Sequence, residues 1–135
     1  MIGDSRSRLF ILCERGRTMV SGTTAHFLYR FDIYVSLGDR TGKPVDRAKI
    51  RGLKNEILEE FGGLTMTSTF GNPVYDGFWL SPKSREVARD KNSVFTVLAP
   101  QTDDTMNYFL SRRAKWQASL NYESLLITVH ELQAL

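Results

Sequence analysis

Residues 27–37 read Phe-Leu-Tyr-Arg-Phe-Asp-Ile-Tyr-Val-Ser-Leu, and this stretch decides the fold. Every odd-numbered position in it is apolar, whereas the even-numbered positions include Arg30, Asp32 and Ser36. Alternation with a period of two over this length predicts a β-strand with one buried face and one more polar face. The odd-numbered side chains are therefore expected to face the core.

A helix is predicted after this strand, beyond a glycine-rich loop. Apolar residues between Ile50 and Phe61 recur at helical spacing along one stripe, and lysines and glutamates occupy the other side. Asp46 is a good N-cap, and Gly62 fits the left-handed position at which helices often end. The helix is expected to span residues 46–61.

The remaining chain predicts three more strands and a second helix. The strands are residues 64–70, 93–99 and 125–132. Residues 74–80 are expected to continue the second strand or to form a short added hairpin arm. Residues 82–92 are expected to form an exposed loop. The second helix runs from Thr102 or Asp103 to about Leu120. The order β-α-β-β-α-β predicts a ferredoxin-like α+β fold. Its sheet would have four antiparallel strands in the spatial order 4-1-3-2, with both helices on one face.

Length and composition indicate one domain. The chain has 135 residues, of which 41% are hydrophobic and 24% charged, as in an ordinary globular core. Residues 1–24 are expected to be a loosely ordered tail, and residues 25–135 the folded domain. The apolar run at residues 9–13 is too short for a signal-peptide core or a membrane span, so the cytoplasm is the expected compartment.

No metal or cofactor is expected. Cys13 is the only cysteine, and His26 and His130 are the only histidines, so a multi-cysteine zinc site and a three-histidine site are both excluded. The glycine pair at residues 62–63 ends a helix and lacks the lysine of a phosphate-binding loop. The net charge of +3 is spread along the chain without the basic stripe typical of nucleic-acid binders.

One face of the predicted sheet is left open by the helices. It would carry the even-numbered side chains of the first strand beside matching side chains of the other strands, so Arg30, Asp32, Tyr34 and His130 are expected to converge. Arginine and histidine bind anions, and an aspartate beside a histidine orients it for proton transfer. Alternatively, these side chains form a cross-strand network that fixes strand register. The candidate ligand-binding or interface residues are Arg30, Asp32, Tyr34, Thr65, Trp79, Thr128 and His130.

Three segments carry a resemblance to a known family. Residues 61–65 read Phe-Gly-Gly-Leu-Thr, residues 77–79 read Gly-Phe-Trp, and residues 123–129 read Glu-Ser-Leu-Leu-Ile-Thr-Val. Over residues 27–132 the chain resembles an uncharacterised family of small conserved bacterial α+β proteins, from which it departs at the longer and more basic stretch 82–92. The resemblance implies the fold, but it implies no mechanism because that family has no assigned activity.

The open face leads to three hypotheses about function. The first is a domain without catalysis that forms a dimer through this face and binds a small ligand. The second is a small enzyme of the dimeric α+β barrel type, which acts on a small organic substrate in a pocket between sheet and helices and uses Arg30, Asp32, Tyr34 and His130. The third, binding of RNA or single-stranded DNA, ranks last because residues 93–99 lack the aromatic and basic signature of sheet-type RNA binders.

Overall fold

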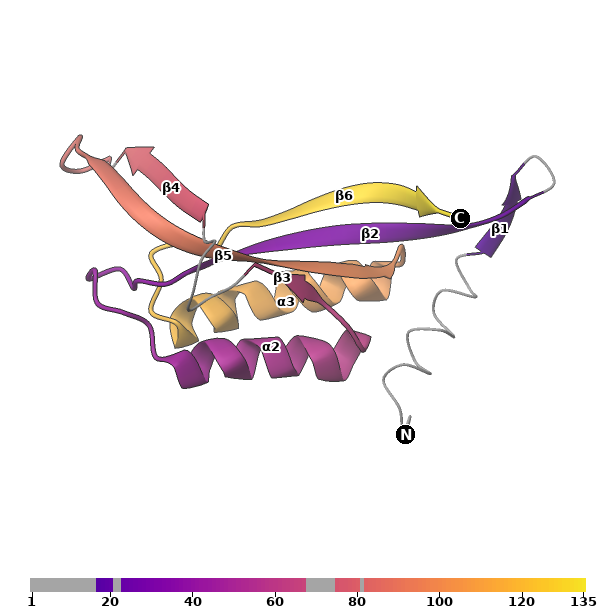
Figure 1. Cartoon of the computed structure of the whole chain (residues 1–135), viewed down its shortest axis with the longest axis horizontal. Helices are drawn as coiled ribbons and strands as arrows, with labels where there is room; N and C mark the ends of the chain where they lie inside the picture. The colour runs from indigo at the N-terminus through magenta and orange to yellow at the C-terminus, as the bar shows by residue number, and fades with distance from the viewer. Residues whose placement is uncertain (1–16, 21–22, 68–74, 81) are drawn as a thin grey trace.

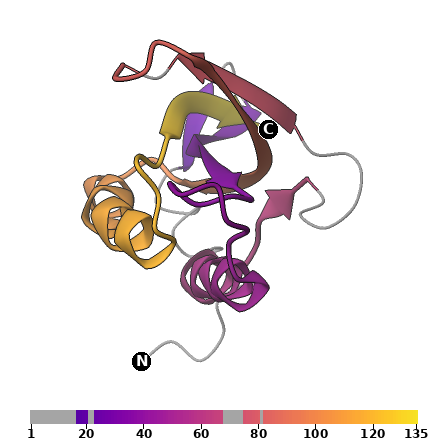
Figure 2. The ribbon, with the colours of Figure 1, turned by 90° about the vertical axis from the view of Figure 1, so that its left-hand side faces the viewer.

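The computed structural model describes residues 17–20, 23–67, 75–80 and 82–135. These residues form two helices and an antiparallel sheet, and both helices lie on the same side of the sheet (Figures 1 and 2). The α+β class predicted from the sequence is thus confirmed. The elements are β1 (Arg17–Val20), β2 (Thr23–Ser36), α2 (Arg47–Phe61), β3 (Thr65–Met66), β4 (Tyr75–Leu80), β5 (Val87–Pro100), α3 (Asp103–Ser119) and β6 (Ile127–Ala134).

Strand β2 is the centre of the sheet. It pairs with β6 along one edge and with β5 along the other, and β5 pairs in turn with β3 and β4. The short strand β1 pairs with the beginning of β2, from Thr23 to His26. Within the described residues the sheet therefore has six strands, not the four that were expected. Residues 17–20 and 23–24, assigned above to the tail, belong to β1 and β2.

The largest departure from the prediction is the length of β5. Residues 87–92 were expected in a loop, but they pair with β4 to form a hairpin that extends away from the helices (Figure 1). Because both faces of this hairpin are largely exposed, its residues need not alternate between apolar and polar, and the usual strand pattern is missing. An ion pair between Arg89 and Asp76, 3.0 Å apart, joins its two strands.

Gly77 in this hairpin has a steric role. A β-carbon built there would lie 2.7 Å from Nδ2 of Asn92, which is closer than such contacts occur. The missing side chain therefore leaves room for Asn92 to lie across β4.

Two other strand boundaries also differ from prediction. Strand β3 covers only residues 65–66 of the expected strand 64–70, and β6 begins and ends two residues later than expected. Residues 68–70 lie outside the described residues.

The two helices agree with the sequence prediction, because their end signals are local. The Asp46 carboxylate accepts a hydrogen bond from the Ala48 backbone N–H at 2.9 Å, and Gly62 ends α2 with a φ of 81°. In α3, the Thr102 hydroxyl accepts a hydrogen bond from the Thr105 backbone N–H at 3.2 Å. Both caps satisfy backbone groups that the helix itself leaves unpaired.

The core lies between the sheet and the helices and is rich in aromatic rings. The odd-numbered residues Phe31, Ile33 and Val35 of β2 are buried there, as predicted. The ring of Phe109 in α3 stacks on Phe31 with centroids 3.8 Å apart and on Phe61 with centroids 5.3 Å apart. These rings connect β2, α3 and α2, so one side chain holds all three elements together.

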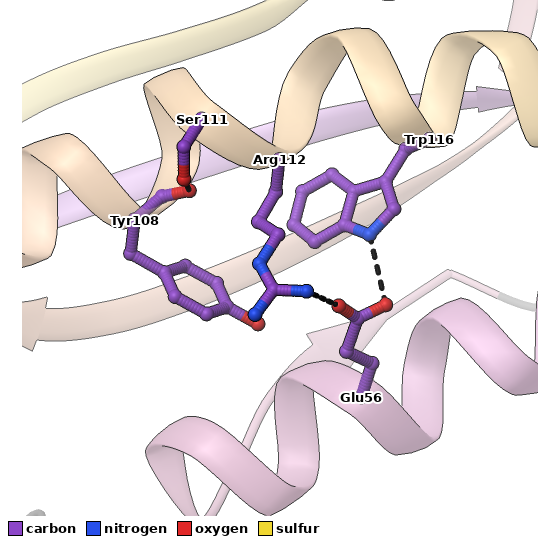
Figure 3. Close-up of polar contacts among 5 residues, drawn as sticks. All are labelled: Glu56, Tyr108, Ser111, Arg112 and Trp116. Atoms are coloured by element: carbon purple, nitrogen blue, oxygen red, sulfur yellow. Dashed lines mark hydrogen bonds and ion pairs between the residues drawn. The ribbon is translucent and has the colours of Figure 1, made fainter.

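A polar bridge reinforces the contact between the two helices (Figure 3). Glu56 of α2 accepts hydrogen bonds from Nη1 of Arg112 at 2.7 Å and from Nε1 of Trp116 at 2.9 Å. The guanidinium of Arg112 lies 5.2 Å from the centroid of the Tyr108 ring. Burial, together with the negative charge of Glu56, raises the pKa of Tyr108 to about 12. Trp116 is itself buried and belongs to the core.

The loop between β2 and α2 is organised by one carboxylate. Oδ1 of Asp39 accepts hydrogen bonds from the hydroxyl and backbone N–H of Thr41 and from the backbone N–H of Lys43, and Oδ2 accepts one from Asn121. The Thr41 hydroxyl has the largest effect in lowering the pKa of Asp39 to about 2. The loop and the end of α3 are thus connected through an ionised side chain.

Asp39→Asn is expected to destabilise the protein at neutral pH and to have much less effect in acid. Because the folded-state pKa lies below the ordinary value of 3.8, ionised Asp39 stabilises the fold above about pH 4, and this contribution is lost as the pH falls toward about 2. Scanning calorimetry of both proteins between about pH 6 and 2.5 measures the difference in Tm. Thr41→Val should weaken the same pH dependence. A Tm difference that stayed constant over this range would contradict the assignment.

Candidate ligand-binding site on the open sheet face

Strand register brings most of the predicted polar residues onto one face of the sheet. Asp32 of β2 lies directly between Thr96 of β5 and Thr128 of β6. Two pairs further along, Arg30 lies between Leu98 and His130. Figure 1 shows both helices on one side of the strands, and the alternate residues Phe31, Ile33 and Val35 are buried in the core on that side, so Arg30 and Asp32 lie on the other side. The face is therefore the one that the helices leave open.

Asp32 is the central polar residue of this face. Only 5% of the residue is exposed, although its side chain lies on the open side of the sheet. Its Oδ1 accepts hydrogen bonds from the Thr96 hydroxyl at 2.7 Å and from Nε of Arg30 at 3.2 Å. Among the residues that the structure describes, Oδ2 accepts no hydrogen bond. The carboxylate is thus fixed through one oxygen and retains acceptor capacity at the other.

An open groove of about 540 Å³ lies beside this carboxylate. Its floor is formed by β2 and β5, and β3 and the start of β4 complete its wall. The lining residues are Arg30, Asp32, Tyr34, Thr65, Met66, Thr67, Tyr75, Val94 and Thr96. They combine one carboxylate and one guanidinium with three threonines and two tyrosines. The groove can therefore accept both hydrogen-bonding groups and an apolar or aromatic group.

The short strand β3 is held against β5 by side chains at the groove. The Thr67 hydroxyl accepts a hydrogen bond from the Val94 backbone N–H at 3.0 Å, and it lies 3.1 Å from the Ser93 hydroxyl. The Ser93 hydroxyl donates to the Thr67 carbonyl at 2.8 Å. These bonds extend the pairing of β3 beyond its two ladder residues, so this wall of the groove is tied to the central strands.

The predicted site residues divide into two groups. Arg30, Asp32, Tyr34 and Thr65 line the groove. Thr128 and His130 lie on the other side of β2, on β6. Trp79 belongs to β4, but its side chain is outside the part of the structure that is described.

Thr128 and His130 differ in their surroundings. Oγ1 of Thr128 is buried and has no hydrogen-bond partner among the described residues. His130 is exposed, and no hydrogen bond joins it to Asp32 within the described chain. The arrangement in which an aspartate orients a histidine for proton transfer is therefore not formed. The described residues also contain no group of three or more metal-ligating side chains.

Several lining residues were missed from the sequence, chiefly Tyr75, Val94 and Thr96. Thr96 lies within the apolar run of residues 94–98, which hides the alternation of that strand. Tyr75 lies in the short hairpin arm that was one of the two alternatives for residues 74–80, and it pairs with Asn92, which was expected in a loop. Correct registers for β4 and β5 would have identified all three residues.

Comparison of the chain with family models, with curated proteins and with solved structures found no match. The resemblance to small bacterial α+β proteins stays a prediction. Among the helices that the structure describes, none combines the length and apolar character needed to cross a membrane.

Proposed function

We propose that this protein is a cytoplasmic, self-associating domain that binds a small ligand in the groove of its open sheet face and carries out no catalysis. We further propose that its architecture is ferredoxin-like, with β2, α2, β3, β5, α3 and β6 as the β-α-β-β-α-β unit. Pairing of β6 with β2, β2 with β5 and β5 with β3 supports the spatial order 4-1-3-2. Strands β1 and β4 are additions to this unit.

The observation that carries the ligand-binding proposal is the buried Asp32 at the edge of the groove. Burial of a carboxylate is costly unless its oxygens are hydrogen-bonded. Here the protein supplies two donors to Oδ1 and none from the described residues to Oδ2. Oδ2 is not among the buried side-chain atoms without a partner, so solvent reaches it, and a ligand N–H or O–H group in the groove would replace that water as its donor. The strands on either side keep the carboxylate in place for such a ligand.

Self-association is supported by exposed apolar side chains around the groove. Leu98 lies beside Arg30 on β5 and is 47% exposed, and Tyr75 at the rim is 58% exposed. Contiguous apolar patches rimmed by polar residues mark surfaces that a partner covers. A second copy placed face to face would cover these side chains and close the groove over a bound ligand.

Saturation-transfer NMR with a panel of small compounds tests the ligand-binding proposal. The panel contains amino acids, carboxylic acids, amines and nucleosides at millimolar concentration. We expect at least one class to bind the wild-type protein and to lose its signal with Thr65→Trp, which fills the groove. The matched control is Ser119→Trp, at the exposed end of α3, which should bind as the wild type does. Absence of binding by every class, or binding that Thr65→Trp leaves unchanged, would contradict the proposal.

A further inference from the structure

We propose that the ligand is a small zwitterion, an α-amino acid with an apolar or aromatic side chain, whose ammonium group binds Asp32 and whose carboxylate binds Arg30. This inference rests on the proposed ligand-binding function and specifies its chemistry. It is carried by three features of the groove: the Asp32 oxygen and the Arg30 guanidinium nitrogens to which no described residue is bonded, and the neighbouring tyrosine and valine side chains.

Asp32 selects the positive end of the ligand. Its Oδ2 accepts no hydrogen bond from the described residues, while the groove begins directly beside it. Hydrogen bonds between a charged donor and a carboxylate are about twice as strong as those between neutral groups. An ammonium group therefore satisfies this oxygen better than a hydroxyl does, and an anionic group there would be repelled.

Arg30 selects the negative end. Only Nε of its guanidinium is bonded to Asp32, and the two terminal nitrogens form no hydrogen bond or ion pair with the described residues. Its side chain is 49% exposed and lines the same groove, so these nitrogens are accessible from solvent. Their planar geometry suits a carboxylate, which they bind through two parallel hydrogen bonds.

The charge balance of the site favours a ligand with both charges. Arg30 and Asp32 neutralise each other, so a ligand of zero net charge leaves the site neutral. A simple amine or a simple carboxylic acid would satisfy one residue and add an unbalanced charge. The aromatic rings of Tyr34 and Tyr75 and the side chain of Val94 supply the contact for the ligand's apolar group.

Isothermal titration with L-phenylalanine and two blocked analogues tests this assignment. L-Phenylalaninamide lacks the carboxylate, and N-acetyl-L-phenylalanine lacks the ammonium group. We expect L-phenylalanine to bind the wild-type protein at least about tenfold more tightly than either analogue, because each analogue loses a charged hydrogen bond. The Asp32→Asn variant should lose the preference for L-phenylalanine over the N-acetyl compound. The Arg30→Gln variant should lose the preference for L-phenylalanine over the amide.

Lys115→Gln is the matched control, since it removes one positive charge from α3 and should leave both preferences unchanged. Circular dichroism and Tm establish that each variant is folded. Equal affinity for L-phenylalanine and both analogues would overturn the zwitterion assignment. The zwitterion assignment would also be overturned if only a panel class other than the amino acids bound in the groove and Thr65→Trp blocked that binding. The proposed ligand-binding function would then still stand. If no panel compound binds, the proposed function itself is contradicted.

Discussion

Phe109→Ala should lower the free energy of unfolding by about 3–5 kcal/mol, the usual cost of removing a large buried aromatic side chain. Phe109 is only 2% exposed and stacks on both Phe31 and Phe61. Its removal opens a cavity where β2, α2 and α3 meet. Urea denaturation followed by circular dichroism measures the change.

The neighbouring residue provides the control for this substitution. Leu110 lies on the same helix but is 65% exposed, so Leu110→Ala should change the stability by no more than about 0.5 kcal/mol. If Phe109→Ala proves too unstable to purify, Phe109→Leu retains part of the volume and should cost about 1.5 kcal/mol. A Phe109 variant as stable as the Leu110 variant would show that the aromatic stack does not hold the helices to the sheet.

Leu98→Asp should raise the dissociation constant of the proposed dimer by about 10- to 100-fold. Leu98 is an exposed apolar residue on the open face, next to Arg30, and a second copy would bury it. The substitution removes an apolar contact from the interface and brings two like charges, one from each copy, onto facing surfaces, which opposes association even where Arg30 pairs with the new carboxylate. Sedimentation velocity over a range of protein concentrations measures the change in association.

Leu110→Asp is the matched control for the interface, because it introduces the same charge on the helical side of the molecule. It should leave the dissociation constant within about twofold of the wild-type value, since exposed positions away from an interface contribute little to binding. A wild-type protein that stays monomeric at millimolar concentration would contradict self-association. Equal effects of the two substitutions would place the interface elsewhere.

The sequence predicted the elements whose signals are local. Alternation in residues 27–37 identified β2 and its buried face, and Asp46 and Gly62 marked the ends of α2. In each case the residues of one short segment are sufficient for the prediction, because a helix cap or an alternating strand face does not depend on distant residues. The same local reasoning placed α3 within one residue of its observed bounds.

Two segments that are extended because a neighbouring strand pairs with them were not predicted as strands. Residues 87–92 contain Arg89, Asp90 and Lys91, and they are extended because β4 pairs with them. Strand β1 similarly exists through its pairing with the start of β2. Neither sequence segment shows a regular alternation of apolar and polar residues, so the sequence pattern alone favoured a loop and a tail.

The candidate site was predicted in part for the same reason. Arg30, Asp32 and Tyr34 share a face of one strand, and alternation alone brings them together. Thr96 bonds to Asp32 through the register of β2 against β5, and Tyr75 joins the groove through the register of β4. Register depends on how two strands pair, so it cannot be deduced from the sequence of either segment alone.

Methyl NMR of the protein at high and low concentration tests most directly whether the open sheet face is the interaction surface. Thr65, Thr96 and Leu98 carry methyl groups on that face or in its groove, whereas Leu110 and Ala114 lie on α3. We expect the first three signals to shift as the concentration rises and the signals from α3 to stay in place. Shifts confined to α3, with the open-face methyl groups unchanged, would contradict the account.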